Sequence, residues 1–249
     1  MKIQSCIQIV KVDKKKRVKY FMVSNVVNDM RISNMIHGKI ALSGFFQTLA
    51  NTIGATDLFV PIDKNLIANG DVKMKDKNGN DILIAEKAQT KFINNPIPSF
   101  TLELGYYNGT VDMDHFRLGW LLNDTLGITH YMFIWVLEAD NDAEHVESFN
   151  EIHKVRICMI KRDKIFEMFS DNNLDIMELI ERTSNLTYNS TERKYDKYRE
   201  DIREGMTLVQ SLSYHEKPVN LKVSFNLYLK YADFTVDCDL DTKEIKTVT

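Results

Sequence analysis

Apolar residues along the chain follow two periods, one typical of helices and one typical of strands. From Gly38 to Ile53 the apolar positions have helical spacing, and Gly54 stands where a helix commonly ends in glycine, which predicts a largely buried helix. Alternating apolar runs predict strands at Ile7–Val12, Tyr20–Val23, Asp57–Ile62, Gly70–Met74, Ile82–Phe92 and Phe100–Leu104. We expect the first two strands to pair as a hairpin across a basic turn, and an Asn-Gly turn to join the fourth and fifth.

The second half of the chain continues both patterns. Tyr131–Leu137 is apolar on both faces, which is typical of a central strand, and Val155–Ile160 is expected beside it. Helical spacing between residues 165 and 180 predicts two helices separated at residues 171–173, and the segment 117–122 predicts a short strand or helix. Beyond Pro218, residues 219–229 and 234–240 alternate strictly, which predicts a late β-hairpin with one exposed face.

These elements predict a mixed α/β (α+β) fold with a central mixed sheet flanked by helices. We expect a core over residues 1–170 that includes the N-terminal β-hairpin. Residues 171–249 are expected to add a C-terminal helical segment and β-hairpin packed on the core. The charged stretch Thr191–Glu204 is interpreted as a solvated helix face or a linker.

Composition narrows the class of protein. The chain has 249 residues, 44% of them hydrophobic, and a net charge of −3, which excludes a disordered chain and argues against binding through bulk positive charge. No apolar run approaches the roughly 20 residues that span a bilayer, so we expect no membrane association. The three cysteines form no CxxC pair, which favours a reducing, cytoplasmic setting.

Several common site motifs are absent from the sequence. It contains no GxxxxGK[ST] or GxGxxG string for a nucleotide cofactor, no GxSxG nucleophile turn and no HExxH zinc motif. The six histidines are scattered and show no spacing that pairs a base with an orienting residue. Enzymes that use these motifs are therefore not favoured.

The most informative polar residues lie on the two strands joined by the Asn-Gly turn. On the strand after the turn, Gln89 and Lys91 share one face, because side chains alternate. About seven residues flank the turn on each side, so Asp71 is expected to approach this pair near the open end of the hairpin. A carboxylate, a carboxamide oxygen and an ammonium group together suit Mg²⁺ binding and phosphodiester hydrolysis.

At this point the sequence resembles the PD-(D/E)XK superfamily of restriction-endonuclease-like nucleases. Gly70-Asp71 stands in the place of the Pro-Asp pair, and Gln89-Thr90-Lys91 in the place of the (D/E)XK tripeptide. The resemblance spans about residues 38–169 and implies a Mg²⁺-dependent DNA endonuclease, plausible as a type II restriction enzyme, with Mn²⁺ as a substitute metal.

The resemblance implies roles for particular residues. Asp71, Gln89 and Lys91 would be catalytic, and Asp71, Gln89 and Glu86 would form the metal shell. Asp81, Asp57 and Glu103 are further carboxylates that could complete it.

DNA is the partner that this hypothesis implies, and a homodimer would suit a palindromic site. The basic cluster Lys14, Lys15, Lys16 and Arg17 has no interleaved acid and is expected to contact phosphates. Tyr106 and Tyr107 precede an Asn-Gly pair, and on a loop they could stack on bases.

Two other interpretations of the same residues remain open. Asp71 beside Gly70 is also typical of a turn, and Gln89 and Lys91 of the wet face of an edge strand. The helix 38–53 carries no acidic residue, although family members often contribute a glutamate there. A non-catalytic module that binds nucleic acid or protein through a degenerate nuclease-like fold is therefore the alternative function.

Overall fold

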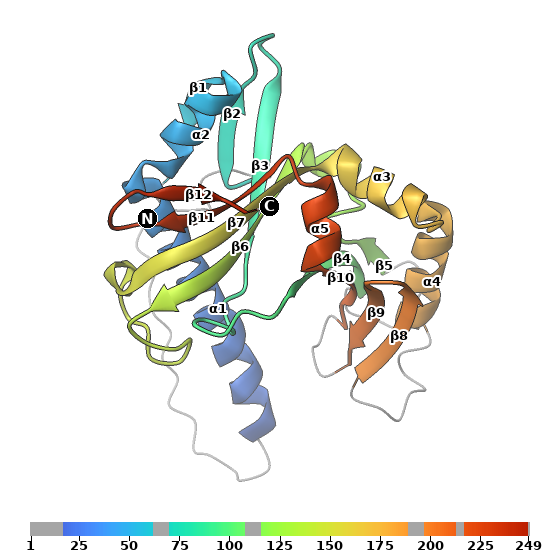
Figure 1. Ribbon diagram of the computed structural model, residues 1–249. Helices are drawn as coiled ribbons and strands as arrows, with labels where there is room; N and C mark the ends of the chain where they lie inside the picture. The colour runs from blue at the N-terminus through green and yellow to red at the C-terminus, as the bar shows by residue number, and fades with distance from the viewer. Residues whose placement is uncertain (1–16, 62–69, 108–115, 189–196, 213–216, 249) are drawn as a thin grey trace, which may run out of the picture.

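A seven-stranded mixed sheet forms the middle layer of the protein (Figure 1). The computed structural model describes residues 17–61, 70–107, 116–188, 197–212 and 217–248. Within them the helices are α1 (Arg17–Ser43), α2 (Phe45–Ile53), α3 (Arg162–Asp171), α4 (Ile176–Tyr188) and α5 (Phe225–Tyr231). The strands are β1 (Thr56–Phe59), β2 (Val72–Lys75), β3 (Asp81–Ala88), β4 (Ser99–Tyr107), β5 (Phe116–Leu118), β6 (His130–Ala139), β7 (Ile152–Lys161), β8 (Lys197–Arg203), β9 (Met206–Ser211), β10 (Val219–Ser224), β11 (Phe234–Asp239) and β12 (Ile245–Thr247).

The large sheet has the strand order β1-β2-β3-β6-β7-β11-β12. Strand β3 pairs with β6 in parallel, and every other neighbouring pair is antiparallel. The predicted central strand is confirmed, because residues 130–136 of β6 are all buried and β7 lies beside it. The predicted hairpin across the Asn-Gly turn is also confirmed as β2 and β3.

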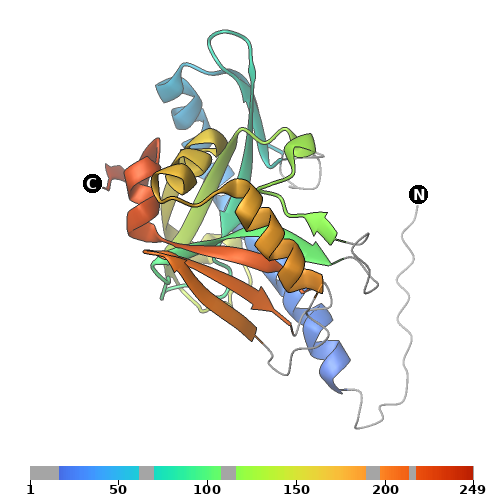
Figure 2. The same ribbon diagram turned by 90° about the vertical axis from the view of Figure 1, so that its right-hand side faces the viewer.

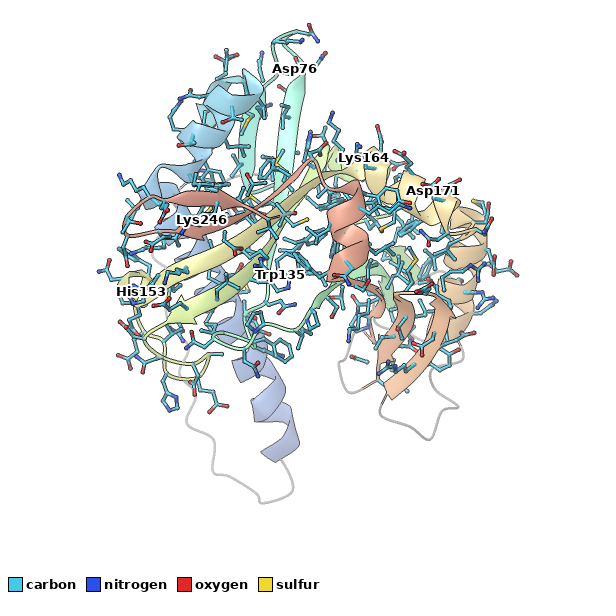
Figure 3. All side chains as sticks on the ribbon, in the orientation of Figure 1. Asp76, Trp135, His153, Lys164, Asp171 and Lys246 are labelled. Carbon is cyan, nitrogen blue, oxygen red and sulfur yellow. The ribbon has the colours of Figure 1, made fainter. Side chains whose placement is uncertain are left out.

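The second sheet is antiparallel and has the order β5-β4-β10-β9-β8. It packs with α3, α4 and α5 on one face of the large sheet, whereas α1 and α2 cover the other face (Figures 1 and 2). Successive side chains of β6 point alternately into the cores on the two faces of the large sheet. Phe133 and Trp135 enter the core shared with the second sheet (Trp135 is labelled in Figure 3), and Met132 and Ile134 enter the core under α1 and α2.

The N-terminal part of the fold differs from the prediction. Residues 20–23 lie in helix α1 and not in a strand, and the proposed partner strand Ile7–Val12 is outside the described residues. Ile32, Ile36 and Ile40 repeat every four residues and are fully buried, so α1 has one apolar stripe that packs on the sheet. The predicted helix 38–53 is two helices, because Gly44 adopts a φ of 82° between them.

The C-terminal part contains further corrections. Residues 219–240 do not form a hairpin: β10 joins the small sheet, α5 follows it, and β11 joins the large sheet beside β7. Residues 197–203 of the charged stretch form strand β8 and not a helix or linker. Both sheets thus contain strands from each side of residue 170, while the domain boundary expected there stays a prediction.

The two helices predicted around residues 171–173 are confirmed as α3 and α4, and Gly54 ends α2 as expected, with a φ of 66°. In the part of the chain that the structure describes, no helix is long and apolar enough to cross a membrane.

Candidate functional site

The β2–β3 hairpin determines which residues Asp71 can meet. Lys75 lies opposite Asp81, and the register is regular, so Asp71 falls opposite Ala85. The Asp71 N–H donates to the carbonyl oxygen of Ile84 at 2.8 Å, and its Oδ2 accepts the N–H of Glu86 at 2.6 Å. Gln89 is four residues beyond Ala85 in the sequence, which corresponds to roughly 13 Å at the rise of a strand. The hairpin therefore brings Asp71 to Glu86 and not to Gln89.

Glu86 meets a histidine from the first helix. Its Oε2 lies 2.8 Å from Nδ1 of His37, and both side chains are fully buried. The Nε2 of His37 lies 2.7 Å from the carbonyl oxygen of Pro61. Helix α1, the segment after β1 and strand β3 thus converge on the buried pair of His37 and Glu86. Asp71 adjoins this pair through the backbone N–H of Glu86, and we call the three residues the Asp71–Glu86–His37 cluster.

Hydrogen-bond chemistry assigns the protons within this cluster. A carbonyl oxygen can only accept, so His37 Nε2 carries a hydrogen and donates it to Pro61. The contact between Nδ1 and Glu86 Oε2 then contains one proton, either on the imidazolium beside a carboxylate or on a carboxylic acid beside a neutral ring. In both forms the pair is electrically neutral, which is the requirement for burying two ionisable groups.

The side chain of Gln89 is hydrogen-bonded to the surrounding backbone. Its Nε2 donates to the carbonyl oxygens of Ile97 and Ser99 at 3.1 and 2.5 Å, and its Oε1 accepts the N–H of Ile97 at 3.1 Å. The side chain is 8% exposed. Gln89 therefore attaches the end of β3 to the start of β4, and its carboxamide oxygen is occupied by a backbone donor.

Lys91 and its neighbour contact helix α1. Lys91 Nζ lies 3.3 Å from Asp29 Oδ2, and the hydroxyl of Thr90 donates to Asp29 Oδ1 at 2.8 Å. A small cavity of about 240 Å³ lies beside Asp29, Gln89 and Lys91. Gln89 and Lys91 thus line the same cavity beside Asp29, but they lie past the end of β3, so the strand face that they were predicted to share does not extend to them.

The alternation predicted along β3 is present. Ile84 and Glu86 face α1, whereas Ala85 faces the opposite core and Lys87 places its Nζ 4.6 Å from the ring centre of Trp120. Two residues beyond Glu86 the chain carries Ala88, so a lysine does not follow the carboxylate at that spacing.

The predicted nucleic-acid contacts fall in three places. Lys14, Lys15 and Lys16 lie outside the described residues, and Arg17 is the first residue of α1. Tyr106 and Tyr107 belong to strand β4 and not to a loop, so that part of the prediction is wrong. Tyr107 is buried, and Lys217 lies 5.5 Å from its ring centre. Only Tyr106 of the two tyrosines keeps a partly exposed side chain that a base could reach.

Sequence reasoning missed His37 and Asp29, because it placed the start of the first helix at Gly38. The repeat of Ile32, Ile36 and Ile40 was the available signal, since apolar residues four apart predict a helix that extends before Gly38.

Among the described residues, no set of three or more His, Cys, Asp and Glu side chains is arranged to hold a metal ion. Asp71 and Glu86 are the two carboxylate residues of the cluster, and they are joined through the backbone N–H of Glu86. Comparison of the chain with protein-family models, with curated proteins and with solved structures finds no match.

Proposed function

We propose that this protein is a Mg²⁺-dependent DNA endonuclease of the restriction-endonuclease-like type, with Asp71 and Glu86 as its metal ligands. One observation carries the proposal: Asp71 Oδ2 accepts the backbone N–H of Glu86, so the Asp71 carboxylate lies against the strand residue that carries the second carboxylate, at the open end of the hairpin. The element order also agrees with a nuclease-like core, because a helix and a hairpin precede β6 and β7.

His37 acts as a positioning residue in this proposal. Its ring is fixed between Pro61 and Glu86, and in its imidazolium form it would keep the Glu86 carboxylate ionised and oriented. It stands on the first helix, where family members often carry a glutamate.

A metal at Asp71 and Glu86 would supply a polarised phosphate and a more acidic water. In the hydrolysis, the water oxygen forms a bond to phosphorus, the bond from phosphorus to the leaving oxygen breaks, and the proton released by the water ends on that oxygen. Asp71 is partly exposed, so its carboxylate is the member of the cluster that solvent can reach, whereas Glu86 is buried. Gln89 and Lys91 support this site through the scaffold and not as ligands.

The test uses the full chain with supercoiled plasmid in Mg²⁺ or Mn²⁺, and titration calorimetry with each metal alone. Asp71→Asn and Glu86→Gln should abolish both cutting and metal binding. Asp81→Asn is the matched control, because Asp81 is an exposed carboxylate at the far end of the same strand, where it pairs with Lys73. Equal cutting by all three variants would refute the assignment of the ligands.

A non-catalytic binding module is the second candidate. It is favoured by the hydrogen bonds that occupy Gln89 and by alanine at position 88, where a tripeptide starting at Glu86 would carry its lysine. Under this alternative, the protein neither cuts DNA nor binds Mg²⁺ or Mn²⁺ at millimolar concentration, yet it shifts a DNA fragment on a native gel. Detectable metal binding that depends on Asp71 would exclude it.

A further inference from the structure

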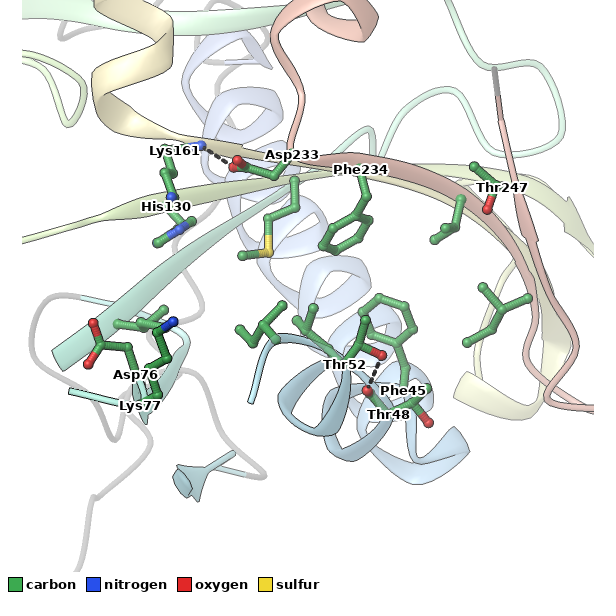
Figure 4. A pocket seen from close by; sticks show the side chains of 16 residues that line it. Phe45, Thr48, Thr52, Asp76, Lys77, His130, Lys161, Asp233, Phe234 and Thr247 are labelled. Carbon is green, nitrogen blue, oxygen red and sulfur yellow. Dashed lines mark hydrogen bonds between the residues drawn. The ribbon is translucent and has the colours of Figure 1, made fainter. Parts of the chain in front are cut away.

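A groove of about 740 Å³ opens between helix α2 and the large sheet, on the face that α1 and α2 cover (Figure 4). Its walls come from α2, the turn between β2 and β3, and strands β3, β6, β7, β11 and β12. The volume falls within the range of about 300–1,000 Å³ that is usual for sites that bind small molecules. The lining does not include Asp71, Glu86 or His37, so the groove is distinct from the cluster proposed above.

The middle of the groove is apolar. Eight of its lining residues are large and hydrophobic: Phe45, Leu49, Ile53, Ile82, Met159, Phe234, Val236 and Ile245. Ile53 and Ile245 are the most exposed of them, at 37% and 39%. A ligand that covers these side chains removes apolar surface from water, which is the main source of affinity in such sites.

The charged residues gather at one end of the groove. Figure 4 shows Lys77, Asp76, Lys161, Asp233 and His130 together on one side of the view, with the threonines of α2 and β12 elsewhere. The groove is therefore amphipathic along its length.

The acids at this end are engaged by neighbouring donors. Asp76 accepts hydrogen bonds from the Asn80 side-chain amide, from the Asn80 N–H and from the Asn78 N–H, and these bonds lower its pKa. Asp233 Oδ2 accepts the N–H of Lys161 at 2.9 Å.

The donors at the same end are not engaged in this way. Within the described part of the chain, the ammonium groups of Lys77 and Lys161 have no carboxylate partner. His130 is 8% exposed, and its Nδ1 contacts the hydroxyl of Thr129 at 2.9 Å, while its Nε2 has no partner among those residues. Burial lowers the pKa of His130 and favours the neutral ring, so the positive charge at this end comes from the two lysines.

We propose that this groove binds a small amphipathic anion, with its apolar body against α2 and β11 and its carboxylate at Lys77, Lys161 and His130. An anion suits the site because the unengaged polar groups are two ammonium ions and one imidazole, whereas the local carboxylates already accept backbone hydrogen bonds. The proposal does not depend on the nuclease activity.

The test is titration calorimetry of the full chain with decanoate below its micelle concentration, compared with decyltrimethylammonium, which has the same chain and the opposite charge. Decanoate should bind at one site, and the cation at least tenfold more weakly. The double variant Lys77→Gln with Lys161→Gln should weaken decanoate about fivefold or more, as expected for partly exposed ion pairs. Lys164→Gln is the matched control, because Lys164 is a lysine of α3 that does not line the groove.

A second variant tests the location without removing charge. Thr52 is an exposed residue of α2 in the groove wall, so Thr52→Trp should fill the groove and abolish binding without lowering the melting temperature. Gln47→Trp places the same ring on an exposed position of α2 outside the lining and should leave binding unchanged.

Four outcomes would overturn the proposal: no binding of decanoate at 1 mM, equal binding of the cation, full binding by Thr52→Trp, or a dimer in sedimentation that Thr52→Trp dissociates. The last result would mean that a second copy of the chain covers the groove.

Discussion

Replacing Gln89 by alanine tests whether this residue belongs to the scaffold or to a catalytic site. The carboxamide makes three hydrogen bonds to the backbone of residues 97–99. Alanine removes all three and leaves the strands β3 and β4 without their side-chain connection. We expect Gln89→Ala to lower the free energy of unfolding and to leave the metal affinity of the protein unchanged.

The magnitude follows from the partners that remain. The carbonyl oxygen of Ile97 keeps two other donors, Trp135 Nε1 at 3.1 Å and the N–H of Ser99 at 2.8 Å. Removing the Gln89 donor from this oxygen therefore changes the free energy of unfolding little. The N–H of Ile97 and the carbonyl oxygen of Ser99 lose the Gln89 partner. At about 1–1.5 kcal/mol for each of these two groups, we expect the free energy of unfolding to fall by about 2–3 kcal/mol. In a protein of this size that corresponds to roughly 5–10 °C in the melting temperature.

Urea unfolding followed by circular dichroism measures the loss, and calorimetry with Mg²⁺ measures the metal affinity. Gln47→Ala is the matched control, because Gln47 is an exposed glutamine whose one described hydrogen bond goes to Asn51, and its replacement should cost less than about 0.5 kcal/mol. The reasoning is refuted if Gln89→Ala is as stable as Gln47→Ala but loses metal binding or DNA cutting.

Two further predictions concern the pH dependence of stability and the space around two glycines. Hydrogen bonds to Asp241 and then Asp140 raise the pKa of His153. The stabilisation from His153 is therefore full below its unfolded pKa of about 6.5 and is lost as the pH rises through the raised folded value. Unfolding at pH 5.5 and 8.5 measures the change, and His153→Gln should reduce the difference between the two pH values; an unchanged difference would contradict the assignment. Gly119→Ala should lower the free energy of unfolding by about 2 kcal/mol or more, because the added Cβ would lie 2.4 Å from a backbone oxygen of β4. Gly38→Ala is the control: nothing lies within 4 Å of that position in helix α1, so the substitution should raise the free energy of unfolding by about 0.5–1 kcal/mol. A Gly119→Ala protein as stable as the wild type would contradict the packing at β4.

The elements that the sequence predicts well are those whose partners are near in the chain or whose burial is complete. Tyr131–Leu137 is apolar at every position, as a strand covered on both faces requires, and it lies in the centre of the large sheet. The hairpin around Asn78-Gly79 is equally local, because Gly79 adopts a φ of 83° and Asp76 accepts the hydrogen bonds of the turn. The residues within each of these two elements are therefore sufficient to predict it.

The C-terminal strands show why the rest was not predictable in the same way. Alternation between residues 219 and 240 predicts strands but does not say which strands they join. Ser224 and Phe225 end β10 and begin α5, so the chain crosses from the small sheet to β7 of the large sheet. Strand β9, beside β10, is near in the chain, but the burial that selects β4 and β7 as partners comes from residues more than 70 positions away, and this information is absent from local periodicity.

The site itself could have been placed more accurately from the turn. A hairpin centred on Asn78-Gly79 pairs residues that lie equally far from its centre, whether the loop has two residues or the five observed between Lys75 and Asp81. Counting outward from either loop brings Asp71 opposite Ala85 or Glu86, and never opposite Gln89. A motif search that requires only a carboxylate, an interval and a lysine ignores this register, and so it selects Gln89 and Lys91 although the residue whose N–H binds the Asp71 carboxylate is Glu86. A search for such sites should therefore fix the strand register from the turn first and only then ask which residues face one another.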